Sequence, residues 1–308
     1  IQEIRNRDVK VKIVVGGPDV NARQVEQNWI TWPTIDAVIY GDGEVAFLEL
    51  VKRWEKTQQI RAGLNCATPD DVGFYQRFRW EDWKPYPVYG GALCADWLEA
   101  NKLIEAQYVD NTQGRKGVAW HIETNRGCPY GCSFCDWSSG LHHKVTIKPL
   151  ESVYADIEVF KLLPNAVHYI NDANFFQLKR DEAILQKLNE SGITYRVGNW
   201  SKLKKETVYE YFIKNADKMN SMVEEGHLGG QTGLGRAAMQ SIKKETLDAI
   251  DRPEIPWEKH KALLQEYKAV RNHELKISAE LINDLPLMTD QDYVWQALEL
   301  YETGIELI

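Results

Sequence analysis

The chain passes from a short apolar segment into a cluster of cysteines at Glu123-Thr124-Asn125-Arg126-Gly127-Cys128-Pro129-Tyr130-Gly131-Cys132-Ser133-Phe134-Cys135. Three of the five cysteines of the chain lie in this run, with the spacing C-x3-C-x2-C. The preceding segment, 118–123, has the composition of a buried β-strand. Enzymes built on parallel sheets place their chemistry where strands end, so a functional site is expected at these cysteines.

Thiolates are soft ligands, and three of them close together predict a metal. A structural zinc ion needs a fourth ligand, which His121, His142 or His143 could supply. A 4Fe-4S cluster held by three cysteines leaves one iron open to a substrate or cofactor. Gly127 and Gly131 favour the cluster, because glycine lets the backbone wrap tightly around it. Three thiols without any metal are the remaining interpretation.

Composition restricts the class of protein. The chain has 308 residues, of which 44% are hydrophobic and 27% charged, and a net charge of -8. These values are typical of a globular protein of one or two domains. No apolar run is long enough for a membrane helix. The sequence also has no stripe of basic residues of the kind that binds nucleic acid. We therefore expect a cytoplasmic protein with reduced thiols, in which Cys66 and Cys94 are inert.

Before the cysteines, strand and helix patterns alternate in residues 1–60. Residues 1–15 predict a short apolar strand and no signal peptide, and the strand at 11–15 ends at Gly16-Gly17-Pro18. A second strand at 35–40 ends at Gly41-Asp42-Gly43-Glu44, and a helix is expected over 45–54. Because a doubly wound sheet needs about five strands, either the chain begins partway through such a domain or another segment completes the sheet.

Residues 61–110 are rich in Trp and Pro and predict an ordered connector. From 111 to 308 strands alternate with helical patterns. The expected strands are 118–123, 167–170, 193–197, a short polar one near 227–231, 275–282 and 305–308. Helical stripes fill the gaps, as with Val153, Ile157 and Phe160 at i, i+4 and i+7. Six strand–helix units without the last helix predict an α/β fold of partial-barrel type.

The spacing C-x3-C-x2-C, with Phe134 before the third cysteine, resembles the signature of the radical S-adenosylmethionine (radical SAM) enzymes. The wider run from Glu123 to Trp137 is similar, more narrowly, to the branch that carries an N-terminal cobalamin (B12)-binding domain. Other stretches match that branch in chain order. They are Gly16-Gly17-Pro18, Tyr40-Gly41-Asp42-Gly43-Glu44, Tyr169-Ile170-Asn171-Asp172-Ala173-Asn174-Phe175, Leu228-Gly229-Gly230-Gln231-Thr232 with Ile250-Asp251-Arg252, and Leu281-Ile282-Asn283-Asp284-Leu285-Pro286.

The resemblance implies a partial (β/α)6 radical SAM barrel over 111–308. It also implies that residues 1–60 are the C-terminal part of a Rossmann-like, flavodoxin-like cobalamin-binding domain. Cys128, Cys132 and Cys135 would hold a 4Fe-4S cluster whose open iron chelates S-adenosylmethionine. Reduction would then cleave S-adenosylmethionine into methionine and a 5′-deoxyadenosyl radical, chemistry that the cofactors carry.

The resemblance also implies roles for other residues. The cofactor-binding residues would be Phe134 and Trp137 on the adenine side, Asp172 and Asn174 at the methionine amino group, Gln231 at the ribose or carboxylate, and Gly16, Gly17, Gly41 and Gly43 at cobalamin. Simpler interpretations stay open, because Asp172 could cap a helix, Gln231 could be a satisfied polar group, and Gly41 and Gly43 could only form a turn. His142 and His143 could be solvated loop residues. No histidine precedes His121, so residues 1–120 offer none to cobalt.

The function expected from this resemblance is cobalamin-dependent methyl transfer to an unactivated carbon or phosphorus centre of a small molecule. An external electron donor such as flavodoxin or ferredoxin would be the protein partner, with no nucleic acid and no membrane. One alternative is a radical SAM cyclase or rearrangement enzyme without cobalamin methyl transfer. An alternative of another class is a non-catalytic module in which three cysteines and a histidine bind zinc.

Overall fold

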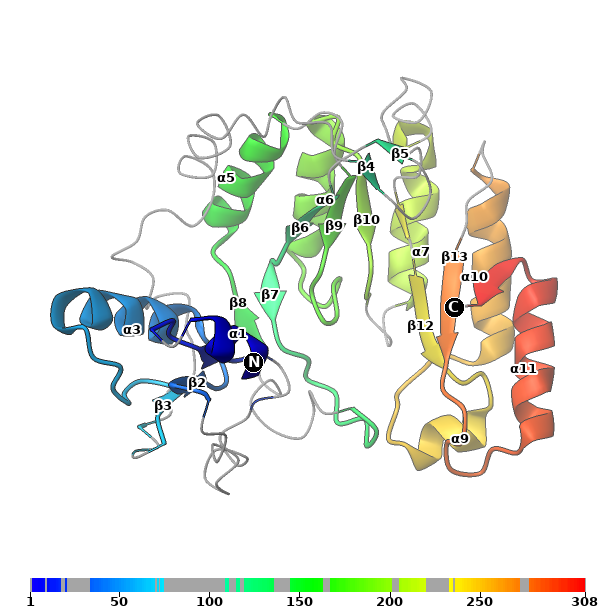
Figure 1. Cartoon of the computed structure of the whole chain (residues 1–308). Helices are drawn as coiled ribbons and strands as arrows, with labels where there is room; N and C mark the ends of the chain where they lie inside the picture. Colours follow the sequence, from blue (N-terminus) through cyan, green and yellow to red (C-terminus); the bar gives the residue numbers. More distant parts are fainter. Residues whose placement is uncertain are drawn as a thin grey trace. The chain divides into compact units, whose positions relative to one another are not determined.

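The computed structural model describes residues 2–8, 10–17, 20, 34–69, 71, 73–74, 109–110, 115–116, 119–135, 145–162, 167–200, 205–219, 233–234, 236–271 and 277–307. The chain divides into two compact units, Ile1–Pro85 and Tyr86–Ile308. Figure 1 shows the elements of both units in chain colours. None of the helices in these ranges is long and apolar enough to cross a membrane.

The first unit contains a three-stranded sheet in the order β1-β2-β3. Strand β1 (Val14–Val15) is parallel to β2 (Ala37–Ile39), and β3 (Cys66–Ala67) is antiparallel to β2. Helix α3 (Glu44–Thr57) follows β2. The two expected strands and the helix are therefore present, and β3 adds residues of the expected connector to the sheet.

The expectation for residues 1–15 is wrong in one part. Gln2–Arg7 form helix α1 and not strand. Arg7 donates a 2.6 Å hydrogen bond to Glu3 one turn earlier, and such i, i+4 pairs stabilise a helix. The apolar strand pattern holds only from Ile13 onward, where Ile13 is buried and Val14 and Val15 are partly buried.

The second unit contains two parallel sheets. The first has the order β6 (Ala119–Ile122), β9 (Val167–Ile170), β10 (Tyr195–Val197) and β11 (Gly233–Leu234). The second has the order β12 (Arg236–Gln240), β13 (Ile277–Leu281) and β14 (Ile305–Leu307). These strands confirm an α/β fold. The polar strand expected near 227–231 lies outside the described residues, and β11 and β12 follow it directly.

Helices occupy the gaps between the strands, as the apolar stripes predict. They are α5 (Leu150–Phe160), α6 (Asp181–Glu190), α7 (Lys205–Lys214), α9 (Lys244–Ala249), α10 (Trp257–Ala269) and α11 (Asp290–Glu302). One hydrophobic core joins all of these helices except α9 to both sheets, and includes Ile157, Ile170, Tyr195, Tyr267 and Ala279. In Figure 1, α5, α6 and α7 lie beside the first sheet, and α10 and α11 lie beside the second.

Two short antiparallel ladders were not expected from the sequence. Strand β4 (Val109–Asp110) pairs with β5 (Arg115–Lys116), and β7 (Asn125–Arg126) pairs with β8 (Thr146–Ile147). The β7–β8 ladder lies at the base of the segment that carries the cysteines. It joins the two ends of that segment and so fixes where the cysteine loop leaves the end of β6.

Candidate metal and cofactor site

The cysteine loop begins directly after β7. Gly127 has φ 100°, a conformation that glycine adopts readily, and it turns the chain into the loop. Cys128 is 8% exposed and Cys132 is 1% exposed, whereas Cys135 is only half-buried. The Cys135 amide donates to the Cys132 carbonyl oxygen at 3.0 Å, which closes a turn around the last two cysteines. Two sulfurs are thus held inside the protein and the third near its surface.

The carboxylate of Asp172, just past the end of β9, fastens the start of this loop. Asp172 is fully buried and accepts hydrogen bonds from the backbone amides of Thr124 and Asn125, at 2.6 Å and 3.2 Å. It also accepts from the Asn125 side chain at 2.6 Å and from the Thr124 hydroxyl. The end of β9 therefore holds the segment between β6 and the first cysteine.

These contacts correct one interpretation of Asp172. Its partners lie 47 and 48 residues earlier in the chain, and the N-cap residue of α6 is Arg180, so Asp172 does not cap that helix. Burial raises the pKa of Asp172 to about 7, although the hydrogen bonds from Thr124 and Asn125 act in the opposite direction. All four bonds hold the loop in place, so contact between Asp172 and a methionine amino group stays a prediction.

Asn174 lies two residues further on and reaches the first cysteine. Its side-chain amide is 3.9 Å from the Cys128 sulfur and donates to it. The Asn174 and Asn125 side-chain oxygens are both buried without a hydrogen-bond partner among the described residues. A buried polar atom left in this state costs free energy, and each such atom in a native structure calls for a ligand, ion or water to explain it. Two unpaired acceptors thus lie beside the cysteine loop.

A residue that sequence reasoning did not assign also contacts the cysteines. The side chain of Arg252 is 1% exposed, hydrogen-bonds to Cys132 and is within Coulombic range of Cys128. Next to it, the Ile250 carbonyl oxygen accepts a 3.0 Å bond from the Ser133 amide. The stretch Ile250-Asp251-Arg252 carries part of the family resemblance, and this was the available signal.

Gln240, at the end of β12, is a second residue that was missed. It is 8% exposed, has φ 57°, and its side-chain oxygen has no partner among the described residues. No strand was expected over 236–240, so the glutamine at the end of this strand was overlooked. Gln231, Trp137, His142, His143 and Cys94 lie outside the described residues, and their expected roles stay predictions.

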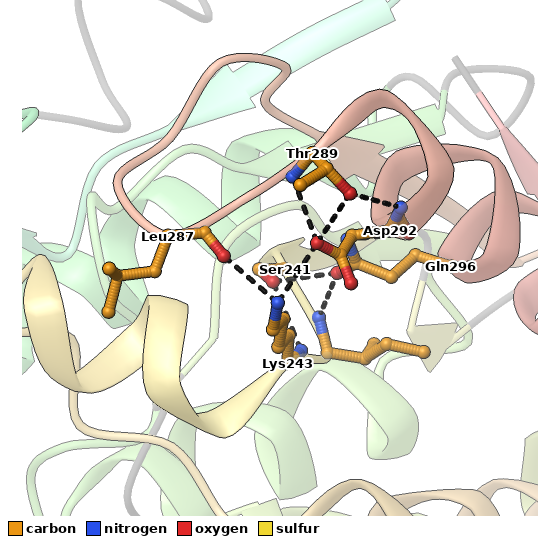
Figure 2. Close-up of polar contacts among 7 residues, drawn as sticks. Ser241, Lys243, Leu287, Thr289, Asp292 and Gln296 are labelled. Atoms are coloured by element: carbon orange, nitrogen blue, oxygen red, sulfur yellow. Dashed lines mark hydrogen bonds and ion pairs between the residues drawn. The ribbon is translucent and has the colours of Figure 1, made fainter.

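The turn after β12 is held by a different polar network (Figure 2). The Gln296 side-chain oxygen on α11 accepts from the Ser241 hydroxyl at 2.6 Å and from the Ile242 amide at 2.7 Å. Lys243 donates to the Leu287 carbonyl and to Asp292, both at 2.9 Å. Thr289 and Asp292 form a capping box at the start of α11. This network ties α11 to the end of β12.

Phe134 and His121 are the remaining candidate residues near the cysteines. Phe134 is 37% exposed, so its ring is available to a ligand. His121 is exposed, stacks on Tyr169 and lies 2.7 Å from the Asn171 side chain. Among the described residues, no three His, Cys, Asp or Glu side chains are arranged to hold a single metal ion. The sulfurs of a 4Fe-4S cluster bind different irons and need not meet at one point, unlike the ligands of one zinc ion.

In the first unit the candidate glycines follow β1 and β2. A Cβ at Gly16 would lie 2.9 Å from the Ile39 carbonyl oxygen, so this position requires glycine for close strand approach. A Cβ at Gly17 would meet nothing within 4 Å. Gly41 has φ 69° and Gly43 is the N-cap residue of α3. The turn interpretation is therefore confirmed for Gly41 and Gly43, and contact with cobalamin stays a prediction.

The thiol of Cys66 differs in chemistry from the three clustered cysteines. Cys66 is 2% exposed, and burial raises the pKa of its thiol to about 11. A thiol that does not ionise near neutral pH is a poor nucleophile and a poor ligand. Burial and the raised pKa agree with the expectation that Cys66 is inert, which stays a prediction.

Comparisons with known proteins found no matching family model but several relatives. The chain is 27% identical over 313 residues to 2-(S-pantetheinyl)-carbapenam-3-carboxylate methyltransferase of Streptantibioticus cattleyicolor, covering 98% of this chain and 42% of that protein. It is 28% identical over 319 residues to the cobalamin-dependent radical SAM methyltransferase TokK of Streptomyces tokunonensis, with the same coverage. The chain thus spans under half the length of these relatives.

A solved structure shares the fold. The radical SAM methyltransferase TsrM from Kitasatospora setae, with cobalamin and a 4Fe-4S cluster bound, superposes with a TM-score of 0.63 at 14% identity. The match covers 99% of this chain and 57% of TsrM. The chain is therefore similar in sequence to methyltransferases, one of which is named as a cobalamin-dependent radical SAM enzyme. This similarity agrees with the resemblance drawn from its sequence, and the solved structure shows that the fold is shared.

Proposed function

We propose that this chain carries the catalytic centre of a cobalamin-dependent radical SAM methyltransferase. The observation that carries the proposal is the buried pair of sulfurs of Cys128 and Cys132, which receive hydrogen bonds from Asn174 and Arg252. Donors aimed at sulfur stabilise thiolates and are a normal part of an iron–sulfur site. The buried thiol of Cys66 instead donates, to the Arg61 carbonyl oxygen at 4.0 Å.

In this proposal Cys128, Cys132 and Cys135 hold a 4Fe-4S cluster. When bound, the cluster supplies an electron to the sulfonium of S-adenosylmethionine, which yields methionine and a 5′-deoxyadenosyl radical. The protein's own residues position these groups. Asp172 holds the start of the loop through Thr124 and Asn125, and the Asn174 side-chain oxygen, buried and unpaired among the described residues, is ready to accept from the methionine amino group.

The finer fold belongs to the same proposal. The two parallel sheets follow each other along the chain, since β11 ends at Leu234 and β12 begins at Arg236. We take them as consecutive parts of one partial barrel, with the cysteine loop, Asn174 and Gln240 at strand ends where barrel enzymes place their sites. The first unit is then the part of a Rossmann-like domain that carries cobalamin, with Gly17 open to the cofactor.

The substrate is proposed to be a small molecule and the electron donor a flavodoxin or ferredoxin. Both curated relatives are methyltransferases, one of them named for a carbapenam carboxylate. Methyl transfer to an unactivated centre is therefore the reaction we favour over cyclisation or rearrangement. The described residues offer no single-ion site that would favour a zinc-binding module.

The test compares Cys132→Ala with Cys66→Ala in chain purified and reconstituted without oxygen. Wild type should hold about four iron atoms and little zinc, and should form methionine and 5′-deoxyadenosine from S-adenosylmethionine and dithionite. Cys132→Ala should lose both properties, and Cys66→Ala should keep both. A colourless protein with zinc would contradict the proposal. Retention of a corrin chromophore after desalting tests the cobalamin part separately.

A further inference from the structure

The two ends of the cysteine loop meet at Thr124 and Lys148. The Lys148 amide donates to the Thr124 carbonyl oxygen at 3.1 Å, and the β7–β8 ladder adds two residue pairs beyond this bond. Ile147 in β8 is 45% exposed, so the ladder buries little apolar surface there. A two-stranded ribbon is at best marginally stable by itself, and bringing the ends of a loop together costs chain entropy. The ends of this loop therefore need support from the rest of the second unit.

Arg180, at the start of α6, contacts both ends of the loop. One terminal nitrogen of its guanidinium donates to the Thr124 carbonyl oxygen at 2.7 Å, and the other donates to the Lys148 carbonyl oxygen. A guanidinium presents its donors in a rigid planar fork, so one side chain can bridge two acceptors at fixed positions. Helix α6 is itself anchored in the core by Ile184 and Leu188. Arg180 thus ties the residue that enters the loop and the residue that leaves it to a well-packed helix.

Thr124 is held from two sides as a result. It is fully buried, and its amide and hydroxyl both donate to Asp172, while its carbonyl oxygen accepts from Arg180 and from the Lys148 amide. The contacts of Asp172 are with the entering end of the loop, at Thr124 and Asn125. Arg180 also reaches the end at which the chain leaves the loop. The two side chains therefore have different tasks, since Asp172 positions the entry and Arg180 closes the loop.

We propose that Arg180 is a positioning residue that clamps the two ends of the cysteine loop together before a cofactor binds, so that Cys128, Cys132 and Cys135 are gathered in advance. This inference deepens the proposed function and rests on it. Ordering a loop costs conformational entropy, and a site that is already ordered binds its ligand more tightly because it avoids this cost on binding. Without the clamp, the loop ends separate more often and the cluster loses iron faster.

The first measurement is amide hydrogen exchange in the cofactor-free chain, resolved to the Lys148 amide by mass spectrometry. Arg180→Met keeps an unbranched side chain and removes both hydrogen bonds. Exchange at Lys148 should become at least about tenfold faster, because hydrogen bonds from a charged group are stronger than neutral ones and local opening sets the exchange rate. Strands β9 and β10 should exchange as in wild type. Arg180→Lys keeps the charge but not the fork, so its rate should lie between the two.

The second measurement is the transfer of iron from the reconstituted chain to a chelator, bathophenanthroline, followed by absorbance. Iron should leave Arg180→Met at least about tenfold faster than wild type, as the lost hydrogen bonds predict. Lys268→Met is the matched control. Lys268 also donates to two carbonyl oxygens, those of Thr303 and Gly304, both at 3.2 Å, but at the end of α11. Its loss should change neither the exchange at Lys148 nor the release of iron.

The inference requires both changes in Arg180→Met, and either change alone overturns it. It is also overturned if exchange accelerates equally in β9 and β10, because Arg180 would then support the fold as a whole, or if Lys268→Met matches Arg180→Met. Where Arg180→Met does not fold, Arg180→Lys decides by the same criteria. Iron in wild type together with wild-type behaviour of Arg180→Met rejects this inference alone, whereas absence of iron from wild type rejects the proposed function on which it rests.

Discussion

Two polar networks fasten strand ends in the second unit, and they differ in what they leave unpaired. At the ends of β6 and β9, Asp172 binds Thr124 and Asn125, while the amide oxygens of Asn125 and Asn174 stay buried without partners among the described residues. In the network of Figure 2, the corresponding amide oxygen of Gln296 accepts two hydrogen bonds. Both networks join segments distant in sequence.

The difference separates a scaffold from a binding site. A buried polar group that is fully hydrogen-bonded adds rigidity, and a partly satisfied group carries a free-energy penalty that a ligand can remove. The side-chain oxygen of Gln296 accepts its hydrogen bonds from within the protein. The network of Gln296 therefore holds α11 against β12. The Asp172 network holds its loop equally firmly but presents spare acceptors beside the cysteines, as a site prepared for a cofactor would.

The largest effect is expected from Asp172→Ala, which breaks the network at the cysteines. The substitution removes the acceptor for four donors of Thr124 and Asn125, both fully buried. We expect the free energy of unfolding to fall by about 3 to 5 kcal/mol and iron binding to be lost with it. Urea unfolding and iron analysis measure the two effects.

Asp172→Asn is the control for this change. Its remaining oxygen still accepts from the two backbone amides, so it should cost less stability than Asp172→Ala and keep more iron. Equal losses in the two variants would contradict the view that the backbone bonds position the loop.

The second prediction compares Asn174→Leu with Gln296→Leu, which remove an unpaired and a hydrogen-bonded amide oxygen. Gln296→Leu leaves the Ser241 hydroxyl proton and the Ile242 amide without their acceptor, so it should lower the free energy of unfolding by about 2 kcal/mol. Asn174→Leu removes an oxygen that has no partner among the described residues and a 3.9 Å bond to the Cys128 sulfur, so it should change stability by less than about 1 kcal/mol.

Ligand binding should show the reverse order. The affinity of the reconstituted chain for S-adenosylmethionine, measured by equilibrium dialysis, should fall at least tenfold in Asn174→Leu and stay unchanged in Gln296→Leu. If Asn174→Leu destabilises the cofactor-free chain as much as Gln296→Leu does, the distinction between the two networks is wrong.

This comparison also shows what the sequence could predict. The cysteine spacing marked the candidate site, and the strand at 167–170 placed Asp172 and Asn174 at a strand end, because both signals are local. The bonds from Asp172 to residues 47 and 48 positions earlier are tertiary contacts that no local pattern contains. The same holds for Arg252, which lay inside a recognised stretch but whose partner, Cys132, is distant in sequence.

Strand β12 was not predicted from the sequence, for a physical reason. Its residues, Arg236–Gln240, include two alanines and end in a glutamine, so they lack the β-branched and aromatic residues that mark a strand. Its pairing with β13 is also irregular between Ala238 and Gln240. Pairing with β13, and not intrinsic preference, makes this segment a strand.

The third prediction uses the titration of Asp172. Its pKa is raised to about 7 by burial, and in the unfolded chain it is about 3.9. Between these values the native state holds a proton that the unfolded state does not, so stability falls as pH rises, by about 1.4 kcal/mol per pH unit. Asp172→Asn has no such group.

Urea unfolding of wild type and Asp172→Asn from about pH 5 to 8 checks this prediction. The stability of wild type relative to the variant should fall up to about pH 7 and then stay level. Parallel curves for the two proteins would mean that Asp172 titrates normally and that its hydrogen bonds outweigh its burial.

The smallest effect is expected at the partly exposed edge of the Gln296 network, from Lys243→Met. Lys243 and Asp292 are 27% and 25% exposed, and such pairs add little stability, so Tm should fall by no more than about 3 °C.

The bond from Lys243, with those from Thr289, lowers the pKa of Asp292 to about 2. Stability from a depressed carboxyl pKa is present above about pH 4 and is lost as pH falls towards 2, so the difference in Tm between wild type and variant should shrink over that range. A difference that is large at neutral pH and insensitive to acid would mean that Lys243 acts through its bond to the Leu287 carbonyl, and that even this edge of the network is scaffold.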